Sequence, residues 1–559
     1  MANFLLPVLT AIALAAKVNF VRKTHQTAAV QERFLLDLLR VQQDTELGQK
    51  YGLREIKTVD QFRDRVPVLP YSSYEPLTEQ IFQGEPNVLT ADPVVFINLT
   101  SGSTGVRKLI PVTKRFQNSL KRANLTSVGF LASALKARNL KFGKLLVTNS
   151  VQLVGRTKNG INYGQASVGV LRMGKFLYQQ VFANPFETLL PSNSLTRHYV
   201  CLLFALRDRS TRGMTANFPM LLLRTCNYLE HYAEDLIQDI DKGTIASWLE
   251  LEPEVRTQLE KQWSADPKRA HELREIVQSH GRLTPKLAWQ DLSFVAAARG
   301  GTSDFYFERF PLYFGDTPIF GAVYSSAEAT FSIYPDVDTD GSVLAVESGF
   351  FEFVPCDQWD AEQPKTLLAT EVKVGERYRL LTTNYSGFYR YDIGDVVEVV
   401  GFYNTAPLIV FRYRSGGTLS ATTEKTTEYH ATQVMQSLQQ EYGGLLEDFC
   451  ITLSESITSP CYLINIELLP GKTLENPQVF LESCDRQLCQ ANASYALKRP
   501  SKYVPDPRLR ILAPGSFAVL RQRYLEKGIP DSQLKFPHIS QDREFLAGLK
   551  VEQEIHFPD

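Results

Sequence analysis

Cysteine is scarce in this 559-residue sequence, and the cysteines that are present form no recognisable pattern. The seven cysteines are scattered, and no two of them have the C-x-x-C spacing. This argues against a disulfide framework and a zinc site and indicates a reducing compartment, so we expect a cytoplasmic protein. The sequence also lacks an H-E-x-x-H motif and a G-x-S-x-G nucleophile elbow. Functions as a zinc hydrolase or a serine hydrolase therefore have no support.

An excess of charge of either sign is missing as well. Sixty lysines and arginines face 61 aspartates and glutamates, which leaves a formal net charge of −1. No overall field attracts the protein to nucleic acid, so small molecules are the expected partners. With 44% hydrophobic residues the chain is long enough for several hydrophobic cores, and we expect a globular monomer.

An uncharged apolar run occupies residues 4–16 (FLLPVLTAIALAA). It is too short to span a bilayer as a helix, and the basic residues Lys17, Arg22 and Lys23 follow it instead of preceding it as in a signal peptide. We expect a helix that docks on the protein itself, without stable membrane insertion. A peripheral membrane anchor or a signal sequence is the alternative.

Residues 100–105 (TSGSTG) combine four hydroxyls and two glycines directly after the β-prone run 94–99. The glycines allow unusual backbone angles, and the hydroxyls and freed N–H groups can face an anion. Lys108 and Lys114 follow as cations. The segment is therefore a candidate phosphate-binding loop, with an ordinary surface turn as the alternative. It is not a Walker loop, because no Gly-Lys-Ser/Thr follows at the required offset.

The order of predicted elements gives an α/β fold with two domains. Helical spacing occurs in five segments, 28–44, 113–136, 215–240, 252–263 and 267–280, and 210–223 is expected to be a core helix or to line a pocket. Short β-rich segments between 318 and 413 predict a small barrel-like subdomain. We therefore expect a large N-terminal domain of sheets flanked by helices (1–413), a hinge (414–425) and a smaller, mobile α+β domain (426–559).

Three further clusters carry side chains suited to nucleotide chemistry. In 324–328 (YSSAE), a ring at a strand end could stack on a base, and Glu328 could hold a metal ion. In 389–395 (YRYDIGD), Asp395 follows a glycine and could accept hydrogen bonds from ribose hydroxyls, with a β-hairpin turn as the alternative. Lys535 lies in a proline-terminated loop, where a lone lysine is usually only solvated surface.

Taken in order along the chain, these motifs resemble those of the adenylate-forming enzyme superfamily. More narrowly, the chain resembles the acyl-acid amido synthetases, the branch that includes the plant auxin- and jasmonate-conjugating enzymes. The resemblance covers about residues 30–540 and includes the hinge LSATTEKTTE. The sequence departs from that family at Thr422, Thr423, Thr427 and His538, where acidic residues and an arginine are usual, and this bears on the choice of amine acceptor.

The resemblance implies ATP- and Mg²⁺-dependent adenylation of a small carboxylic acid, followed by acyl transfer to an amine, with an amino acid expected. It implies a phosphate cradle made of Ser101, Gly102, Ser103, Thr104 and Gly105, with Lys108 nearby as a catalytic cation. Glu328 is implied as the Mg²⁺ ligand. The remaining nucleotide-binding residues implied are Gly300, Gly301, Tyr324, Ser325, Ser326, Asp395 and Arg414.

Lys535 is implied as a catalytic lysine that reaches the α-phosphate or the acyl carboxylate when the C-terminal domain closes. Candidates for the acyl-acid pocket are Tyr163, Val168, Met214 and Phe218, and each could equally be a core residue. Two alternatives stay open: an acyl-CoA ligase that uses the same adenylation chemistry, and a catalytically silent nucleotide-binding homologue.

Overall fold

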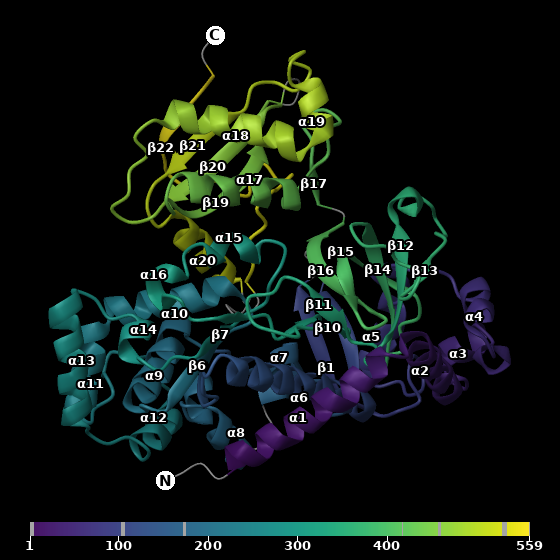
Figure 1. The fold of residues 1–559 in the computed structure, drawn as a ribbon, viewed down its shortest axis with the longest axis horizontal. Helices are drawn as coiled ribbons and strands as arrows, with labels where there is room; N and C mark the ends of the chain where they lie inside the picture. The colour runs from purple at the N-terminus through teal and green to yellow at the C-terminus, as the bar shows by residue number, and fades with distance from the viewer. Residues whose placement is uncertain are drawn as a thin grey trace. The chain divides into compact units, whose positions relative to one another are not determined.

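The computed structural model describes residues 5–101, 107–171, 175–415, 417–456, 460–527 and 534–557. The chain forms two compact units, shown with their elements in Figure 1. The first comprises Met1–Arg299 and Pro311–Phe411, and the second comprises Gly300–Phe310 and Arg412–Asp559. The predicted α/β class with a large N-terminal part and a smaller C-terminal part is confirmed. The boundaries 1–413, 414–425 and 426–559 stay a prediction.

An eight-stranded sheet forms the core of the first unit. Its strand order is β13(Leu367–Leu368), β12(Phe350–Pro355), β14(Arg377–Thr383), β15(Tyr391–Tyr403), β16(Ala406–Arg414), β11(Ser342–Leu344), β10(Thr330–Ile333), β9(Val323–Ser325). Leu35 and Leu39 of α2 (Thr27–Gln42) and Phe62 of α4 (Val59–Arg65) belong to the same buried cluster as Phe350 and Phe353 of β12. The β-rich segments predicted between 318 and 413 are therefore strands, buried because helices cover the sheet.

Strand β15 is irregular near its beginning. Its register against β14 shifts between Arg379 and Leu381, and Gly394 adopts φ +80°, a conformation that favours glycine. The alternative of a hairpin turn at 389–395 is wrong, because Tyr391–Tyr403 is one continuous strand. The irregularity lies between Tyr391 and Asp395, so it sets how these two side chains are presented.

A parallel four-stranded sheet in the order β3(Lys144–Val147), β6(Thr211–Thr215), β7(Phe294–Ala296), β8(Ile319–Phe320) forms a second layer. The prediction of helix across 210–223 is wrong at its start, because 211–215 is a strand inside this sheet. Parallel pairing with β3 and β7 decides its conformation, and a five-residue run has too little periodicity to reveal it. The predicted helix 215–240 is two helices, α10(Pro219–His231) and α11(Ala233–Lys242).

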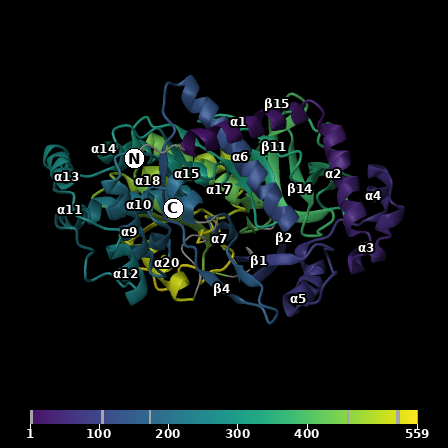
Figure 2. The same cartoon turned by 90° about the horizontal axis from the view of Figure 1, so that it is seen from below.

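The third sheet of this unit has the order β2(Arg107–Thr113), β1(Val94–Ser101), β5(Asn162–Gly164), β4(Leu153–Arg156). Helix α6(Lys114–Ala137) follows β2, as predicted, and α1(Leu5–Thr24) packs beside it (Figures 1 and 2). The remaining α-helices of the unit are α3(Glu46–Lys50), α5(Glu75–Gln83), α7(Ala166–Leu171), α8(Lys175–Val181), α9(Ser194–Arg207), α12(Pro253–Glu260), α13(Pro267–His280), α14(Pro285–Ala288) and α16(Pro311–Phe314).

The second unit is built on a four-stranded sheet in the order β19(Leu446–Leu453), β20(Tyr462–Leu468), β21(Arg508–Leu512), β22(Val551–Ile555). Its helices are α15(Ser303–Phe307), α17(Glu428–Glu441), α18(Pro477–Ala491), α19(Ala493–Lys498) and α20(Ser516–Glu526). A short hairpin, β17(Thr418–Leu419) and β18(Thr426–Thr427), precedes α17. Helices and strands alternate along this unit, in agreement with the predicted α+β class.

Candidate functional site

Two strands of the first unit and the turn between β9 and β10 bring a lysine, a tyrosine and a glutamate into one polar array. Lys108 Nζ on β2 donates to the Tyr391 hydroxyl at 3.2 Å, and this hydroxyl donates to Glu328 Oε1 at 3.4 Å. Lys108 also lies 5.2 Å from the centroid of the Tyr71 ring. Glu328 is only 4% exposed. A cation and a carboxylate thus share one tyrosine hydroxyl, and we call these residues the Lys108–Tyr391–Glu328 array.

The array is placed next to the predicted phosphate loop. Strands β1 and β2 pair in antiparallel register, with Ser101 opposite Arg107 and Thr100 opposite Lys108. Lys108 therefore lies at the loop end of its strand. The predictions for Gly102, Ser103, Thr104 and Gly105 lie outside the described residues. On the other side, Asn98 of β1 donates from Nδ2 to the carbonyl of Ala327 at 3.0 Å, which fastens the Glu328 segment to the loop strand.

A second contact joins the predicted adenine and ribose residues. The Tyr324 hydroxyl donates to Asp395 Oδ2 at 2.6 Å, although β9 and β15 are not neighbours in the sheet. Tyr324 packs against Phe331 and Phe411, with ring centroids 4.9 and 5.4 Å away. The sheet therefore curls enough to bring its edge strand to β15. Asp395 is 2% exposed, so its carboxylate is held in one orientation.

The serines of the YSSAE cluster have different roles. Ser326 forms the turn before Glu328, because its hydroxyl accepts from the Glu328 N–H at 3.1 Å and its own N–H donates to the Ala329 carbonyl at 2.9 Å. Ser325 is exposed. Ser326 thus orients the Glu328 backbone, and Ser325 is accessible to a bound molecule.

Glu328 can serve as an anchor for Mg²⁺. In the described ranges no group of three or more histidines, cysteines, aspartates or glutamates could hold a metal ion by itself. Mg²⁺ bound to a nucleotide needs only one or two protein carboxylates, because phosphate oxygens and water supply the other ligands. A single buried carboxylate near a phosphate loop fits that need, with Glu328 as the residue that would hold the ion.

Asp392 lies between the array and Asp395 along β15. Burial raises the pKa of Asp392, and the positive charge of Arg379, whose Nε lies 3.0 Å from Asp392 Oδ2, opposes this shift. The Asp392 carboxylate also accepts the Gly394 N–H at 2.9 Å. Through these contacts Asp392 holds the irregular segment of β15 in place.

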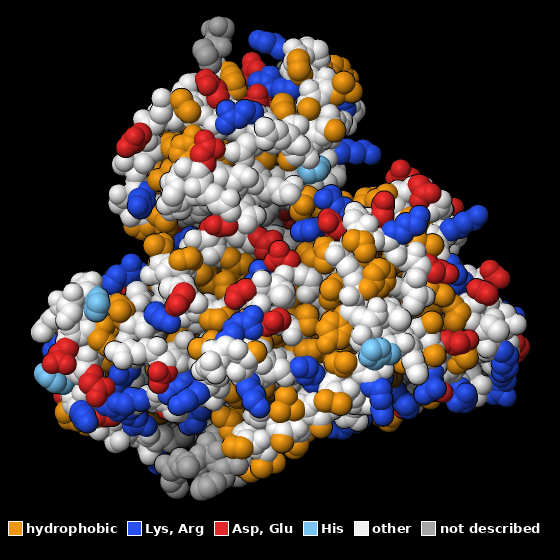
Figure 3. Space-filling model, viewed as in Figure 1, with side chains coloured by type: hydrophobic (Ala, Val, Ile, Leu, Met, Phe, Trp, Pro, Cys, Tyr) orange, Lys and Arg blue, Asp and Glu red, His pale blue; other side chains and the backbone are white. Residues whose placement is uncertain are grey.

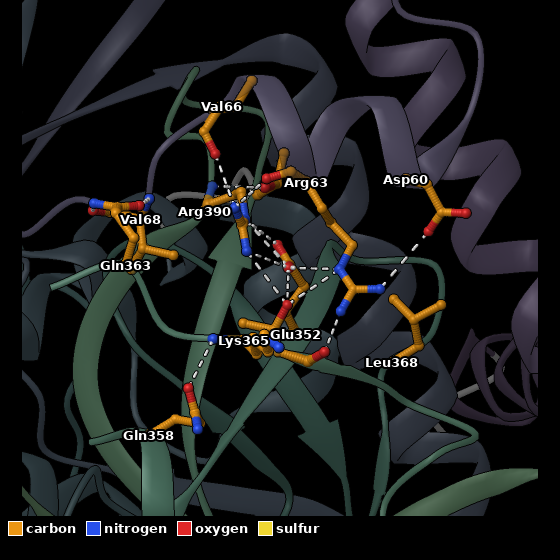
Figure 4. A network of polar contacts seen from close by, with 12 residues as sticks. Asp60, Arg63, Val66, Val68, Glu352, Gln358, Gln363, Lys365, Leu368 and Arg390 are labelled. Atoms are coloured by element: carbon orange, nitrogen blue, oxygen red, sulfur yellow. Dashed lines mark hydrogen bonds and ion pairs between the residues drawn. The ribbon is translucent and has the colours of Figure 1, made fainter. Parts of the chain in front are cut away.

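Arg390, which precedes Tyr391, is at the centre of a buried ionic network (Figure 4). Its guanidinium donates to both Glu352 carboxylate oxygens at 3.0 and 3.2 Å, and to the carbonyls of Arg63 and Val66 at 2.7 and 2.8 Å. Thr366 donates to Glu352 at 2.6 Å. The network joins α4, β12 and the start of β15, and it fixes the backbone from which Tyr391 projects.

Tyr391 was not among the predicted site residues, although it lies inside the motif YRYDIGD. Its ring is fully buried, and it contacts Tyr74 with centroids 6.0 Å apart. The one sequence feature that could have indicated Tyr391 is its place near Asp395, the predicted ribose-binding aspartate. Sequence alone gives no indication that its hydroxyl meets Lys108, because the two residues lie on strands of different sheets.

Four predicted site residues belong to the second unit. Lys535 is exposed, and its neighbours Leu534 and Phe536 are buried in a hydrophobic cluster with Phe517. Arg414 ends β16 and is half-buried. Gly300 and Gly301 have φ of +83° and +58° and directly precede α15. The lysine is therefore presented to solvent from a segment that is anchored on both sides.

His538, which stands where the resembling family commonly has arginine, is a buried structural residue. Its Nε2 lies 3.3 Å from both Asp448 Oδ1 and the Tyr306 hydroxyl, and its ring stacks on Phe449 with centroids 4.1 Å apart. Tyr306 in turn donates to both oxygens of Asp448 at 3.2 Å. These contacts attach the segment Gly300–Phe310 to the second unit.

The predicted acyl-pocket residues are dispersed over several environments. Val168 is fully buried in a cluster with Phe96, Val112 and Phe116, and Met214 is buried in the centre of the parallel sheet. Tyr163 is half-buried on β5, and Phe218 is half-buried directly before α10. Val168 and Met214 thus occupy core positions, whereas Tyr163 and Phe218 keep part of their surface available.

Two surface cavities of about 480 and 460 Å³ lie elsewhere in the first unit. Arg209 lines both, and its guanidinium pairs with Asp266 and Glu272 at 3.1 Å. Lys144, the first residue of β3, lines the larger one and pairs with Asp208 at 3.0 Å. These cavities flank the amino ends of parallel strands, whereas α/β sheets bind ligands at the carboxyl ends. Neither is lined by a predicted site residue.

Comparisons with known proteins agree with this architecture. Models of the GH3 family match the chain in three parts: the N-terminal domain over residues 16–319, the central domain over 342–414 and the C-terminal domain over 429–544. The chain is 27% identical to a jasmonoyl–L-amino acid synthetase of Nicotiana attenuata, covering 92% of this chain and 91% of the relative. It is 26% identical to an indole-3-acetic acid-amido synthetase of Arabidopsis thaliana, covering 92% and 89%.

Solved structures show the same fold. The AtGH3.15 acyl acid amido synthetase in complex with 2,4-DB superimposes with a TM-score of 0.84 at 23% identity, covering 98% of each chain. A 2-hydroxyisobutyryl-CoA ligase in the postadenylation state superimposes with a TM-score of 0.53 at 12% identity, covering 96% of this chain and 90% of that chain.

Proposed function

Because the chain belongs to the GH3 family, we propose that it is an acid–amino-acid ligase that activates a small carboxylic acid with ATP and transfers the acyl group to an amine. The curated relatives are named as synthetases that join jasmonate or indole-3-acetic acid to amino acids. The products would be an amide, AMP and pyrophosphate. The pyrophosphate-exchange assay with a panel of acids and amines would identify the acyl acid and the amine of this protein.

Adenylation answers a chemical difficulty of the substrate. A carboxylate is a poor electrophile, because its charge repels nucleophiles and its oxygen is a poor leaving group. In the proposed first step the carboxylate oxygen attacks the α-phosphorus of ATP, the bond to the β-phosphate breaks, and pyrophosphate leaves. In the second step the amine attacks the acyl carbon and AMP leaves. Charge grows on phosphoryl oxygens in the first transition state, so cations and N–H donors must already be in place.

The observation that carries the proposal is the Lys108–Tyr391–Glu328 array beside the loop end of β1 and β2. It supports a site in which Lys108 faces the phosphates and Glu328 holds Mg²⁺, which would neutralise phosphate charge. Asp395, whose carboxylate accepts a hydrogen bond from Tyr324, is proposed to accept hydrogen bonds from the ribose hydroxyls. These groups belong to one compact unit, which supports the proposal that they serve one nucleotide site.

Lys535 is proposed to supply the α-phosphate cation from the second unit, which would swing about the predicted hinge 414–425. Within that segment, the β17–β18 hairpin moves with the second unit, because the Tyr462 hydroxyl donates to Leu419 O at 3.0 Å and to Glu424 Oε1 at 2.6 Å. The rotation is therefore expected in the part of the segment that precedes residue 418.

Burial alone would raise the pKa of Glu424. Hydrogen bonds from Tyr462 and from the N–H groups of Ala421 and Thr422 outweigh burial and hold this pKa below its ordinary value of 4.5. The hairpin thus contains a buried, ionised carboxylate that keeps it rigid. The rigid hairpin supports a model in which the rotation occurs over a few residues before it. A linker that is flexible along its whole length is not needed.

The test of the proposed function is acid-dependent exchange of labelled pyrophosphate into ATP, measured with a panel of aromatic and aliphatic carboxylates. Exchange with at least one acid, followed by amide formation with an amino acid mixture and release of AMP, would support an amido synthetase. Exchange followed by thioester formation with CoA and no amide would assign the acyl-CoA ligase instead. Absence of exchange with every acid, while ATP still binds, would favour a catalytically silent homologue.

A further inference from the structure

Helix α1 exposes an apolar face that is unusual for a protein surface. The helix has 20 residues; its most apolar 18-residue stretch has a mean hydropathy of 1.6, and only 11% of that stretch is buried. Val8, Ile12 and Val18 are 52%, 50% and 69% exposed. A helix that is apolar on all sides is normally buried in a protein core or in lipid. Figure 3 shows hydrophobic side chains gathered over the place that α1 occupies in Figure 1.

The opposite side of α1 is fastened to α6. Phe20 packs edge-on against Phe130 with centroids 6.1 Å apart, and Lys17 Nζ donates to Ser133 Oγ at 2.8 Å. Gly129 allows the two helices to approach closely, since a Cβ there would lie 2.2 Å from the Ala13 carbonyl oxygen. The exposed apolar face is therefore held at the surface by specific contacts on the other side of the helix.

The charged residues of this segment are all basic and lie toward one end of the helix. No aspartate or glutamate occurs between residues 5 and 31, and the basic residues of α1, Lys17, Arg22 and Lys23, all lie in its second half. Arg22 is exposed, and it follows the exposed Val18 by four residues, so the two lie on the same face of the helix. Lys23 pairs with Glu347. An apolar face that continues into a basic end, without acidic residues, complements the surface of an anionic lipid bilayer.

We propose that α1 docks this face in the plane of an anionic membrane surface while the rest of the chain stays folded. The face from residue 5 to residue 18 would lie at the boundary between headgroups and acyl chains, with Arg22 among the headgroups. Spanning the bilayer is disfavoured, because it would strip Phe20, Lys17 and Ala13 from their contacts with α6. Docking would bring the enzyme to a surface into which apolar carboxylic acids partition. This proposal does not depend on the proposed chemistry.

The test is co-sedimentation of the full-length protein with vesicles of phosphatidylcholine, with and without phosphatidylglycerol. We expect binding that needs phosphatidylglycerol and weakens as salt is added. Ile12→Glu and Val18→Glu should each lower the vesicle partition coefficient on the order of tenfold or more. Leu497→Glu is the matched control, because Leu497 of α19 is an 80% exposed apolar residue outside α1. It should bind like the wild type.

Several results would overturn the proposal. Failure of the wild type to bind anionic vesicles at low salt, or equal loss of binding in Leu497→Glu, would remove the lipid-facing role of α1. Binding that resists alkaline carbonate would show a spanning helix in place of an in-plane one. A solution dimer that Val18→Glu dissociates, without vesicle binding, would assign the face to a second copy. Unchanged circular dichroism and pyrophosphate exchange in each variant would separate these outcomes from misfolding and from the proposed function.

Discussion

Replacing Arg390 with methionine should destabilise the first unit severely, because Arg390 is the counter-ion of a buried carboxylate. Glu352 is only 1% exposed and receives two hydrogen bonds from Arg390. Without Arg390 it would keep Thr366 and the more distant Arg63, whose Nε lies 3.7 Å away. The carbonyls of Arg63 and Val66 would also lose their donor. Methionine keeps an unbranched apolar stem like that of arginine, so the change mainly removes the guanidinium with its charge and donors.

The expected loss is about 3–5 kcal/mol, the usual result of removing one partner of a buried ion pair. The first unit has about 400 residues, and unfolding entropy of about 2.1 cal/mol/K per residue gives it about 0.8 kcal/mol/K. A loss of about 4 kcal/mol then lowers the melting temperature of this unit by about 5 °C. Differential scanning calorimetry of the full chain can follow the transition of this unit separately from that of the second.

Two further variants sharpen the test. Arg54→Met removes an arginine whose partner Asp44 is, like Arg54 itself, mostly exposed, so the melting temperature should change by less than about 1 °C. The double variant Arg390→Met/Glu352→Met removes both buried charges and should recover much of the lost stability. If Arg390→Met melted like Arg54→Met, or if the double variant were no more stable than the single one, the network would not have the assigned energetic role.

Three other perturbations test the site and the hinge. Tyr391→Phe removes the hydroxyl between Lys108 and Glu328, and acid-dependent pyrophosphate exchange should fall roughly tenfold to a hundredfold; unchanged exchange would take the array out of catalysis. Lys535→Ala should lower exchange about a hundredfold or more while ATP binding, measured calorimetrically, persists. Glu424→Gln should destabilise the second unit at neutral pH, because the pKa of Glu424 is lower in the folded protein than its ordinary value of 4.5. The stability that this carboxylate contributes is fully present above about pH 4.5 and is lost as acid protonates it. Urea unfolding should therefore show a difference from the wild type that shrinks on acidification, and a growing difference would contradict the assignment.

Much of the fold could be predicted, because its signals are local. The segments that became β12, β14, β15 and β16 are rich in β-branched and aromatic residues and are separated by turns, and α6 and α13 show helical spacing with clear ends. The strand at 211–215 was missed because its conformation depends on parallel partners at 144–147 and 294–296, which are distant in sequence. Local propensity cannot report such pairing.

The candidate site was predictable in part for the same reason. Glu328 follows a predicted strand end, Asp395 follows a glycine, and Lys108 follows the glycine–hydroxyl loop as a cation, so each has a local signal. Tyr391 was not chosen, because its role depends on β15 meeting β2 across two sheets. The sequence shows only a tyrosine between Arg390 and Asp392, and the fold decides which groups its hydroxyl meets.

The segment Gly300–Phe310 shows why a contiguous domain boundary is hard to read from sequence. It lies more than a hundred residues before the predicted hinge, yet Tyr306 contacts Asp448 and His538, and Arg309 Nη2 pairs with Glu447 at 2.8 Å. Tyr306, Asp448, His538 and Arg309 are buried, and the buried Arg309 charge keeps its stability only while Glu447 stays close. If the second unit rotates during the reaction, these ion pairs should carry Gly300 and Gly301 with it. These two implied nucleotide-binding residues would then move with the second unit, so ATP binding would be sensitive to that rotation.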